Sequence, residues 1–86
     1  MIHERSDYMH IQDNTGKIGN DEPVFLLRAK DELAPVVLQY WVDRLRLREG
    51  NTIAAKAVQK HIDLMKKWQK ENGCKTPDTP ADTVSV

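Results

Sequence analysis

Two helical patterns separated by a very short link constrain the fold of this chain more than any other feature. Residues 31–48 and 52–72 place apolar side chains at the three- and four-residue intervals of amphipathic helices. Gly50 ends the first pattern, and Asn51 or Thr52 caps the second. A link this short permits only an antiparallel or sharply angled pair of helices. The sequence therefore predicts a helical hairpin.

The first helix is expected to begin at Asp31, whose carboxylate can accept hydrogen bonds from the unpaired amides of a first turn. Pro35 then lies in that turn, where its missing amide is tolerated. A helix that is apolar on most sides is buried on most sides, and one partner helix cannot cover this one. We therefore predict a homo-oligomer. The apolar residues spread far beyond one stripe: Leu33, Val36, Val37, Leu38, Tyr40, Trp41, Val42, Leu45 and Leu47.

The second helix has a narrower apolar stripe and ends at Gly73. A core drawn from so few residues usually needs a disulfide, a metal or a second subunit. Cys74 is the only cysteine, so no disulfide can form within the chain. This leaves oligomerisation as the way to complete the core. The stripe consists of Ala54, Ala57, Val58, His61, Ile62, Met65 and Trp68.

The segments that flank the hairpin are shorter. Val24–Leu27 is a continuous apolar run that suggests a buried strand, although so short a run is also compatible with a helix. Residues 1–22 contain a turn signal at 13–16 and form either a small hairpin or an extended arm. Residues 74–86 contain two prolines and suggest a flexible tail. The prediction is an α+β fold, mainly α, with a short N-terminal strand or strands and a strand-plus-hairpin core over 23–73.

Charge is spread unevenly along this chain, whose net charge is zero. Residues 1–23 carry two basic and five acidic side chains, residues 24–70 carry ten and five, and residues 71–86 carry one and three. The basic centre favours an anionic partner, although the same side chains would also suit a solvated helix face. A net charge of zero lacks the strong basic signature of a nucleic-acid-binding protein, so we expect no nucleic-acid partner.

No catalytic or metal-binding pattern stands out, and we predict neither an enzyme nor a cofactor. His3, His10 and His61 have no partner at metal-ligand spacing, and nothing beside Cys74 would stabilise a thiolate. The lone cysteine suits a reducing compartment, and the polar start of the chain does not resemble a signal peptide. No apolar run approaches the length of a membrane span. We therefore expect a cytoplasmic protein without a membrane partner.

The most suggestive binding residues lie at and after the junction that precedes the first helix. Arg28 and Lys30 follow the apolar run and precede a helix start, where free backbone amides attract anions. Tyr40 and Trp41 offer flat faces for ring stacking, and Arg44 adds charge from the first helix. Aromatic faces beside cations suit a nucleotide-like anion, although packing in a core or interface is the simpler role for Trp41.

Two motifs carry a resemblance to a group of proteins. Residues 13–18 read DNTGKI and residues 22–31 read EPVFLLRAKD, and together they resemble small proteins encoded by tailed phages and prophages. The likeness continues through the hairpin to Trp68 and into the proline-containing tail. It implies no particular activity by itself. Small, oligomeric, non-enzymatic phage proteins often inhibit host defence, and one class sequesters cyclic nucleotide immune signals in pockets between subunits.

The leading hypothesis is a phage-type anti-defence sponge, a homo-oligomer that holds a cyclic nucleotide or cyclic ADP-ribose signal without turnover. One alternative is an inhibitor or adaptor that docks on a host protein through the apolar surface of the first helix. A second alternative is a small DNA-binding phage regulator. In the leading hypothesis, the ligand-binding residues are Arg28, Lys30, Tyr40, Trp41 and Arg44.

Overall fold

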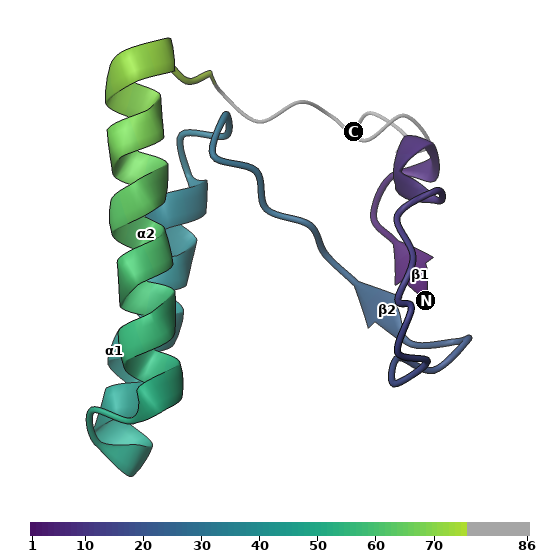
Figure 1. The fold of residues 1–86 in the computed structure, drawn as a ribbon, viewed down its shortest axis with the longest axis horizontal. Coiled ribbons are helices and arrows are strands. Elements are labelled where there is room, and N and C mark those ends of the chain that lie inside the picture. Colours follow the sequence, from purple (N-terminus) through teal and green to yellow (C-terminus); the bar gives the residue numbers. More distant parts are fainter. Residues whose placement is uncertain (76–86) are drawn as a thin grey trace, which may run out of the picture. The chain divides into compact units, whose positions relative to one another are not determined.

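The computed structural model describes residues 1–75, which form two units that we describe separately. The N-terminal unit comprises Met1–Leu26, and the hairpin unit begins at Leu27 (Figure 1). The boundary therefore lies four residues beyond the predicted one, because the short strand before it belongs with the N-terminal unit. Of the predicted tail, residues 76–86 lie outside the described residues.

The N-terminal unit is held together by a minimal parallel sheet. Strand β1 (Ile2–His3) pairs with β2 (Pro23–Val24), with Ile2 opposite Pro23 and His3 opposite Val24. A short 3-10 helix, η1 (Ser6–Tyr8), follows β1. The Met1 ammonium group donates to the carbonyl oxygens of Gly19 and Asn20 at 2.7 and 2.9 Å. Residues 1–22 are thus neither the small hairpin nor the extended arm that the sequence suggested.

The prediction of a buried strand over Val24–Leu27 is wrong. Strand β2 stops at Val24, and the Phe25 side chain is 69% exposed. The physical reason is that β1 is only two residues long and offers no further backbone partner. The Glu4 carboxylate accepts from the Leu26 amide at 3.0 and 3.2 Å in its place. A side chain therefore ends the sheet where a strand would have continued it.

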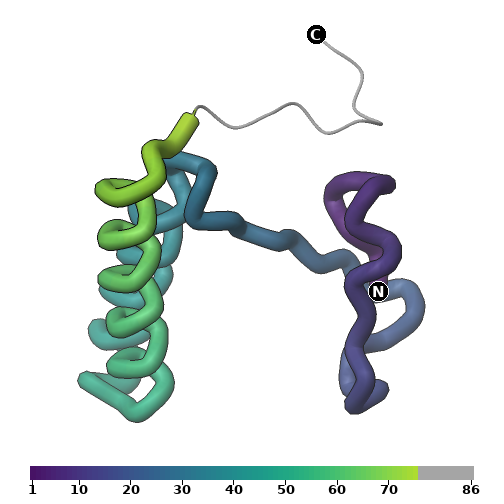
Figure 2. Tube along the Cα trace, turned by 45° about the horizontal axis from the view of Figure 1, so that its top comes forward, coloured from purple at the N-terminus to yellow at the C-terminus, as the bar shows by residue number. Residues whose placement is uncertain are grey.

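The predicted helical hairpin is confirmed. Helices α1 (Ala34–Glu49) and α2 (Ile53–Asn72) run antiparallel and lie side by side in both views (Figures 1 and 2). The Thr52 hydroxyl accepts from the Ala55 amide at 3.1 Å and caps α2 as expected. Gly50 and Gly73 end the helices with φ of 80° and 81°, a conformation that other residues rarely adopt.

The start of the first helix differs from the prediction. Helix α1 begins at Ala34 instead of Asp31, and Pro35 lies in its first turn as expected. The Asp31 carboxylate accepts from the Leu33 amide at 2.8 Å, and the Asp31 carbonyl accepts from the Ala34 amide at 3.1 Å. Asp31 therefore stabilises a turn that precedes the helix and does not cap the helix itself.

The core between the helices is small. Val42, Ala55 and Ile62 are fully buried, and the partly buried residues Leu38, Leu45 and Val58 pack against them. The buried stripe of α2 is rotated from the predicted one, since Ala55 is buried whereas Ala54, Ala57 and His61 are exposed. Among the described residues, only Val42 and Ile62 are large side chains with no exposed surface.

One edge of the hairpin is polar, and its side chains form hydrogen bonds with one another. Gln39 and Gln59 exchange reciprocal side-chain hydrogen bonds of 2.9 and 3.0 Å across the helices. The Arg46 guanidinium donates to the Gln59 side-chain oxygen at 3.2 Å. Such paired polar groups can face water without loss. This edge therefore resembles a solvent boundary of the hairpin.

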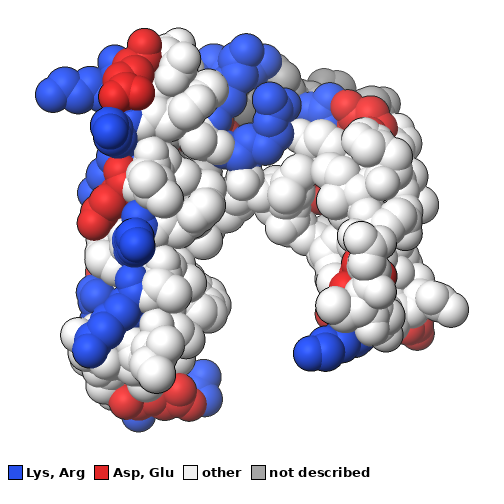
Figure 3. Space-filling view, viewed as in Figure 1, with Lys and Arg blue, Asp and Glu red and all other residues white. Residues whose placement is uncertain are grey.

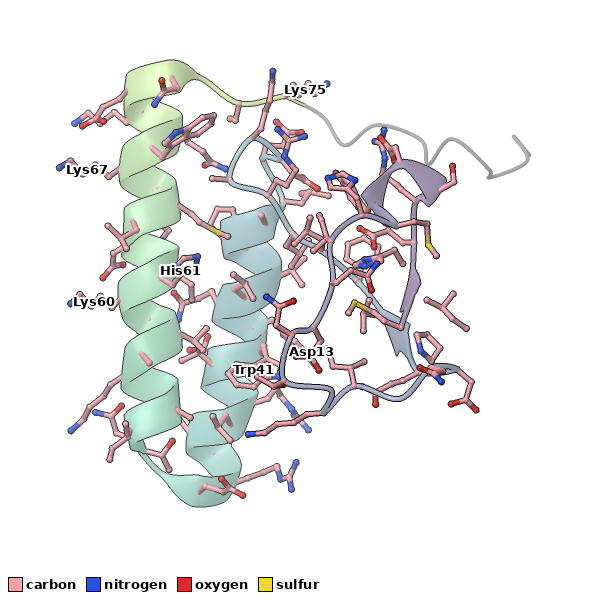
Figure 4. The ribbon with its side chains drawn as sticks, turned by 45° about the vertical axis from the view of Figure 1, so that its right-hand side comes forward. Asp13, Trp41, Lys60, His61, Lys67 and Lys75 are labelled. Carbon is pink, nitrogen blue, oxygen red and sulfur yellow. The ribbon has the colours of Figure 1, made fainter. Side chains whose placement is uncertain are left out.

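The other edge is apolar and open. Counting helical turns from the buried Val42 and Ile62 places Val37 and Trp41 of α1 on the same side as Trp68 of α2, away from the glutamine pair. Trp41 is 49% exposed and Trp68 41%. In Figure 4, Lys60 and Lys67 point to one side of α2, whereas Trp41 and His61 lie toward the other. The hairpin therefore has one polar and one apolar edge.

The core predicts a contrast between two isoleucines of α2. Replacing the fully buried Ile62 with valine should lower the free energy of unfolding by about 1 kcal/mol, because a buried methylene is lost and a cavity remains. The same change at Ile53, which is exposed, should alter the free energy of unfolding by less than about 0.5 kcal/mol. Urea unfolding followed by circular dichroism measures both. Equal effects would contradict this assignment of the core.

The loop at Asp13 predicts a pH dependence for the N-terminal unit. Hydrogen bonds from the Thr15 hydroxyl and the Ile18 amide lower the pKa of Asp13 from 3.8 to about 2. A lowered pKa in the folded state contributes stability above pH 3.8 that disappears as the pH falls through about 2. Carbon-detected NMR titration should show this midpoint in the native protein. Thr15→Val should raise the pKa of Asp13 toward its ordinary value, because the hydroxyl donor is lost. Unfolding the protein with denaturant should raise this pKa in the same way.

Candidate anion-binding pocket

A pocket of about 420 Å³ lies within the hairpin unit, between residues 27–30 and one side of α2. This volume is at the lower end of the range for small-molecule sites and is large enough for one mononucleotide-sized group. The loop that precedes α1 forms one wall, and two turns of α2 form the other. The lining residues are Leu27, Arg28, Ala29, Lys30, His61, Leu64, Met65 and Trp68.

Hydrogen bonds join the loop that forms one wall of the pocket to the end of α2 and to the residues that follow it. The Gln69 side-chain amide donates to the carbonyl oxygens of Ala29 and Asp31 at 2.8 and 2.9 Å. The Lys75 amide donates to the Lys30 carbonyl at 2.9 Å, and the Glu32 amide donates to the Lys75 carbonyl at 3.0 Å. The segment that carries Arg28 and Lys30 is therefore anchored at consecutive residues, to Gln69 of α2 and to Lys75, which follows α2.

The chemistry of the lining combines cations with flat rings. Arg28 and Lys30 come from the loop, and no acidic side chain lines the pocket. His61 and Trp68 are two helical turns apart on α2 and lie on one face of it. Apolar side chains complete the wall between them. The pocket thus suits a ligand with an anionic group at one end and an apolar or aromatic group at the other.

The lysine side chains of α2 are exposed and form a solvated face. In Figure 3, lysine and arginine side chains alternate with acidic ones along the left side of the hairpin, and a separate group of basic side chains lies near the top of the view. Lys60 and Lys67 point away from the hairpin in Figure 4. The excess positive charge of residues 24–70 is therefore not gathered in one site.

The structure brings together two of the five predicted site residues. Arg28 and Lys30 both line the pocket, whereas Tyr40, Trp41 and Arg44 do not. Tyr40 is 68% exposed, and Arg44 is also exposed. The reason is geometric, because the helical segment that builds the pocket wall is α2 and these three residues lie on α1.

Trp68 and His61 supply the rings of the pocket, a role that the sequence analysis assigned to Tyr40 and Trp41. The sequence placed both in the inner stripe of α2, a packing role. His61 is exposed and Trp68 is partly exposed, so both are available at the pocket. Their spacing of seven residues on one helix was the available signal. That spacing predicts that the two rings share a face of α2, but it does not predict which loop lies opposite that face.

The expected free amides at the helix junction are absent. The Asp31 amide donates to the Arg28 carbonyl at 3.0 Å, and the amides of Glu32, Leu33 and Ala34 also have acceptors within the chain. No amide from residue 31 to residue 34 is left for a ligand. Attraction for an anion at this place therefore comes from the side chains of Arg28 and Lys30.

Within residues 1–75, no three histidine, cysteine or acidic side chains are grouped so as to hold a metal ion. Neither helix described here is both long enough and apolar enough to cross a membrane. Comparisons with protein-family models, with curated proteins and with solved structures found no match to this chain.

Proposed function

We propose that this protein binds a nucleotide-derived anion in the hairpin pocket and sequesters it without turnover. The observation that carries the proposal is that Arg28, Lys30 and Trp68 line one pocket. An arginine guanidinium matches phosphate oxygens in a bidentate geometry, and a lysine adds a point charge. A base stacked on an aromatic ring contributes roughly 1–3 kcal/mol. The two kinds of group together favour a nucleotide over either a bare anion or an apolar ligand.

The biological setting of the proposal rests on the motifs in residues 13–18 and 22–31. The resemblance to phage proteins implies that the ligand is an immune signal of the cyclic nucleotide or cyclic ADP-ribose type and that the protein acts in the host cytoplasm. The single cysteine, Cys74, is consistent with that reducing compartment. Sequestration needs tight binding and no catalytic group, so a small chain is sufficient.

Calorimetric titration tests the proposed function. The panel comprises AMP, cyclic di-AMP, cyclic trinucleotides and cyclic ADP-ribose isomers. We expect at least one to bind, and Arg28→Ala, Lys30→Ala and Trp68→Ala each to weaken that binding by about tenfold or more. Arg44→Ala is the matched control, since Arg44 lies outside the pocket, and it should leave the affinity unchanged. Absence of heat with every ligand, on the folded protein, would sink the proposal.

We further propose that the apolar edge of the hairpin is an interface in a homo-oligomer. The core of the hairpin unit contains only two large, fully buried side chains, which is little for a stable isolated pair of helices. Trp41 and Trp68 are half-exposed, and an aromatic side chain can bury about 150–250 Å². The exposed residues Val37 and Leu64 extend the same apolar surface. A second copy would remove this surface from water.

A different candidate function uses the outer side of α1. Val36, Tyr40 and Leu47 are exposed there, and exposed apolar surfaces of this kind often mark protein-binding sites. An inhibitor or adaptor that docks on a host protein would need such a surface to stay free in the purified protein. An oligomer formed through the apolar edge would leave this surface free, so burial of Tyr40 in the purified protein, and not the oligomeric state, tests this candidate.

Light scattering coupled to size-exclusion chromatography tests the interface. We expect the native protein to elute as an oligomer and Trp41→Glu to shift it to a smaller species, because a buried unpaired charge opposes association. Lys60→Glu is the control, since Lys60 points away from the apolar edge (Figure 4). A native protein that stays monomeric at every concentration would contradict the interface.

A further inference from the structure

Gln69, near the end of α2, contacts the loop that carries the cations of the pocket. We propose that Gln69 is a positioning residue that sets the spacing between Arg28 and Lys30 on one side and Trp68 on the other. The ligand would then be selected by the distance between its anionic group and its ring. This inference rests on the proposed function of the pocket and deepens it.

The first support is the geometry of the Gln69 side chain. Its single amide nitrogen donates to the carbonyl oxygens of Ala29 and Asp31, at 2.8 and 2.9 Å, so both of its hydrogens are used. The two acceptors are two residues apart, and a turn closed by the Asp31 amide on the Arg28 carbonyl holds them in place. Gln69 is partly buried, so water competes weakly for these bonds.

The second support is that the loop backbone is satisfied at three consecutive carbonyls. The Ala29 and Asp31 carbonyls accept from Gln69, and the Lys30 carbonyl between them accepts from the Lys75 amide at 2.9 Å. The path of the backbone through residues 29–31 is therefore specified by bonds to α2 and to the residues that follow it. The side chains of Arg28 and Lys30 are left to face the pocket.

The third support is the position of Gln69 next to Trp68. Consecutive residues on a helix point about 100° apart, so one side chain reaches the loop while its neighbour lines the pocket. Because a helix is rigid over one residue, the loop and the ring are joined through a short, stiff connection. Glutamate at this position would offer no donor at neutral pH, and leucine would offer none at any pH.

An experiment without ligand tests the hydrogen bonds between Gln69 and the loop. Hydrogen exchange should be about tenfold faster for the Asp31 and Glu32 amides in Gln69→Leu than in the native protein, because two partly buried hydrogen bonds are lost. Gln59→Leu is the matched control, since it removes cross-helix bonds from the same helix but away from the pocket. Gln69→Glu should regain protection when its carboxyl is protonated, whereas Gln69→Leu should not.

Titration with ligand tests the selection. Gln69→Leu should weaken the binding of the best nucleotide among AMP, cyclic di-AMP and cyclic ADP-ribose by about tenfold, while the weak binding of inorganic phosphate should change little. Gln59→Leu should leave both affinities unchanged. Such a split supports positioning, because a general loss of stability would lower both affinities together.

The outcomes separate this inference from the proposed function. If the native protein binds a nucleotide but Gln69→Leu matches Gln59→Leu in exchange or in affinity, the inference is overturned and the proposed function stands. If the native protein binds no nucleotide, the proposed function fails, and the selecting role of Gln69 fails with it, whatever the exchange experiment shows about the loop.

Discussion

The packing of Val42 against Ala55 and Ile62 is the interaction on which the hairpin depends. These residues are fully buried, and the small side chain of Ala55 allows close approach near the turn. Their contact sets the rotation of each helix about its axis. Once that rotation is set, helical spacing determines which other side chains of α1 and α2 share an edge. The glutamine pair falls on one edge and the two tryptophans on the other.

The contrast between these edges links folding to function. The polar edge satisfies its own hydrogen bonds through Gln39 and Gln59, so it gains nothing from a partner. The apolar edge leaves Trp41 and Trp68 half-exposed in a unit with a small core. Trp68 also lines the pocket. Association through the apolar edge would therefore place a second copy beside the proposed binding site.

The pocket brings two cations to one wall in a chain without net charge. Arg28 and Lys30 are brought to one wall, and the acidic residues Asp31 and Glu32 that follow them do not line the pocket. The Asp31 carboxylate instead accepts from the Leu33 amide. The amides of this junction are likewise used within the chain, so the side-chain cations carry the attraction that a helix start would otherwise supply.

Local interactions allowed the sequence to determine much of the hairpin. The cap at Thr52 and the stops at Gly50 and Gly73 involve residues close in the chain, and each was confirmed. The length of β2 and the presence of the Trp68 ring in the same pocket as Arg28 depended on distant residues. Glu4 bonds Leu26 across 22 positions, and Gln69 bonds Ala29 across 40. Only the tertiary structure could decide these, because no local pattern records which remote donor or acceptor a segment will meet.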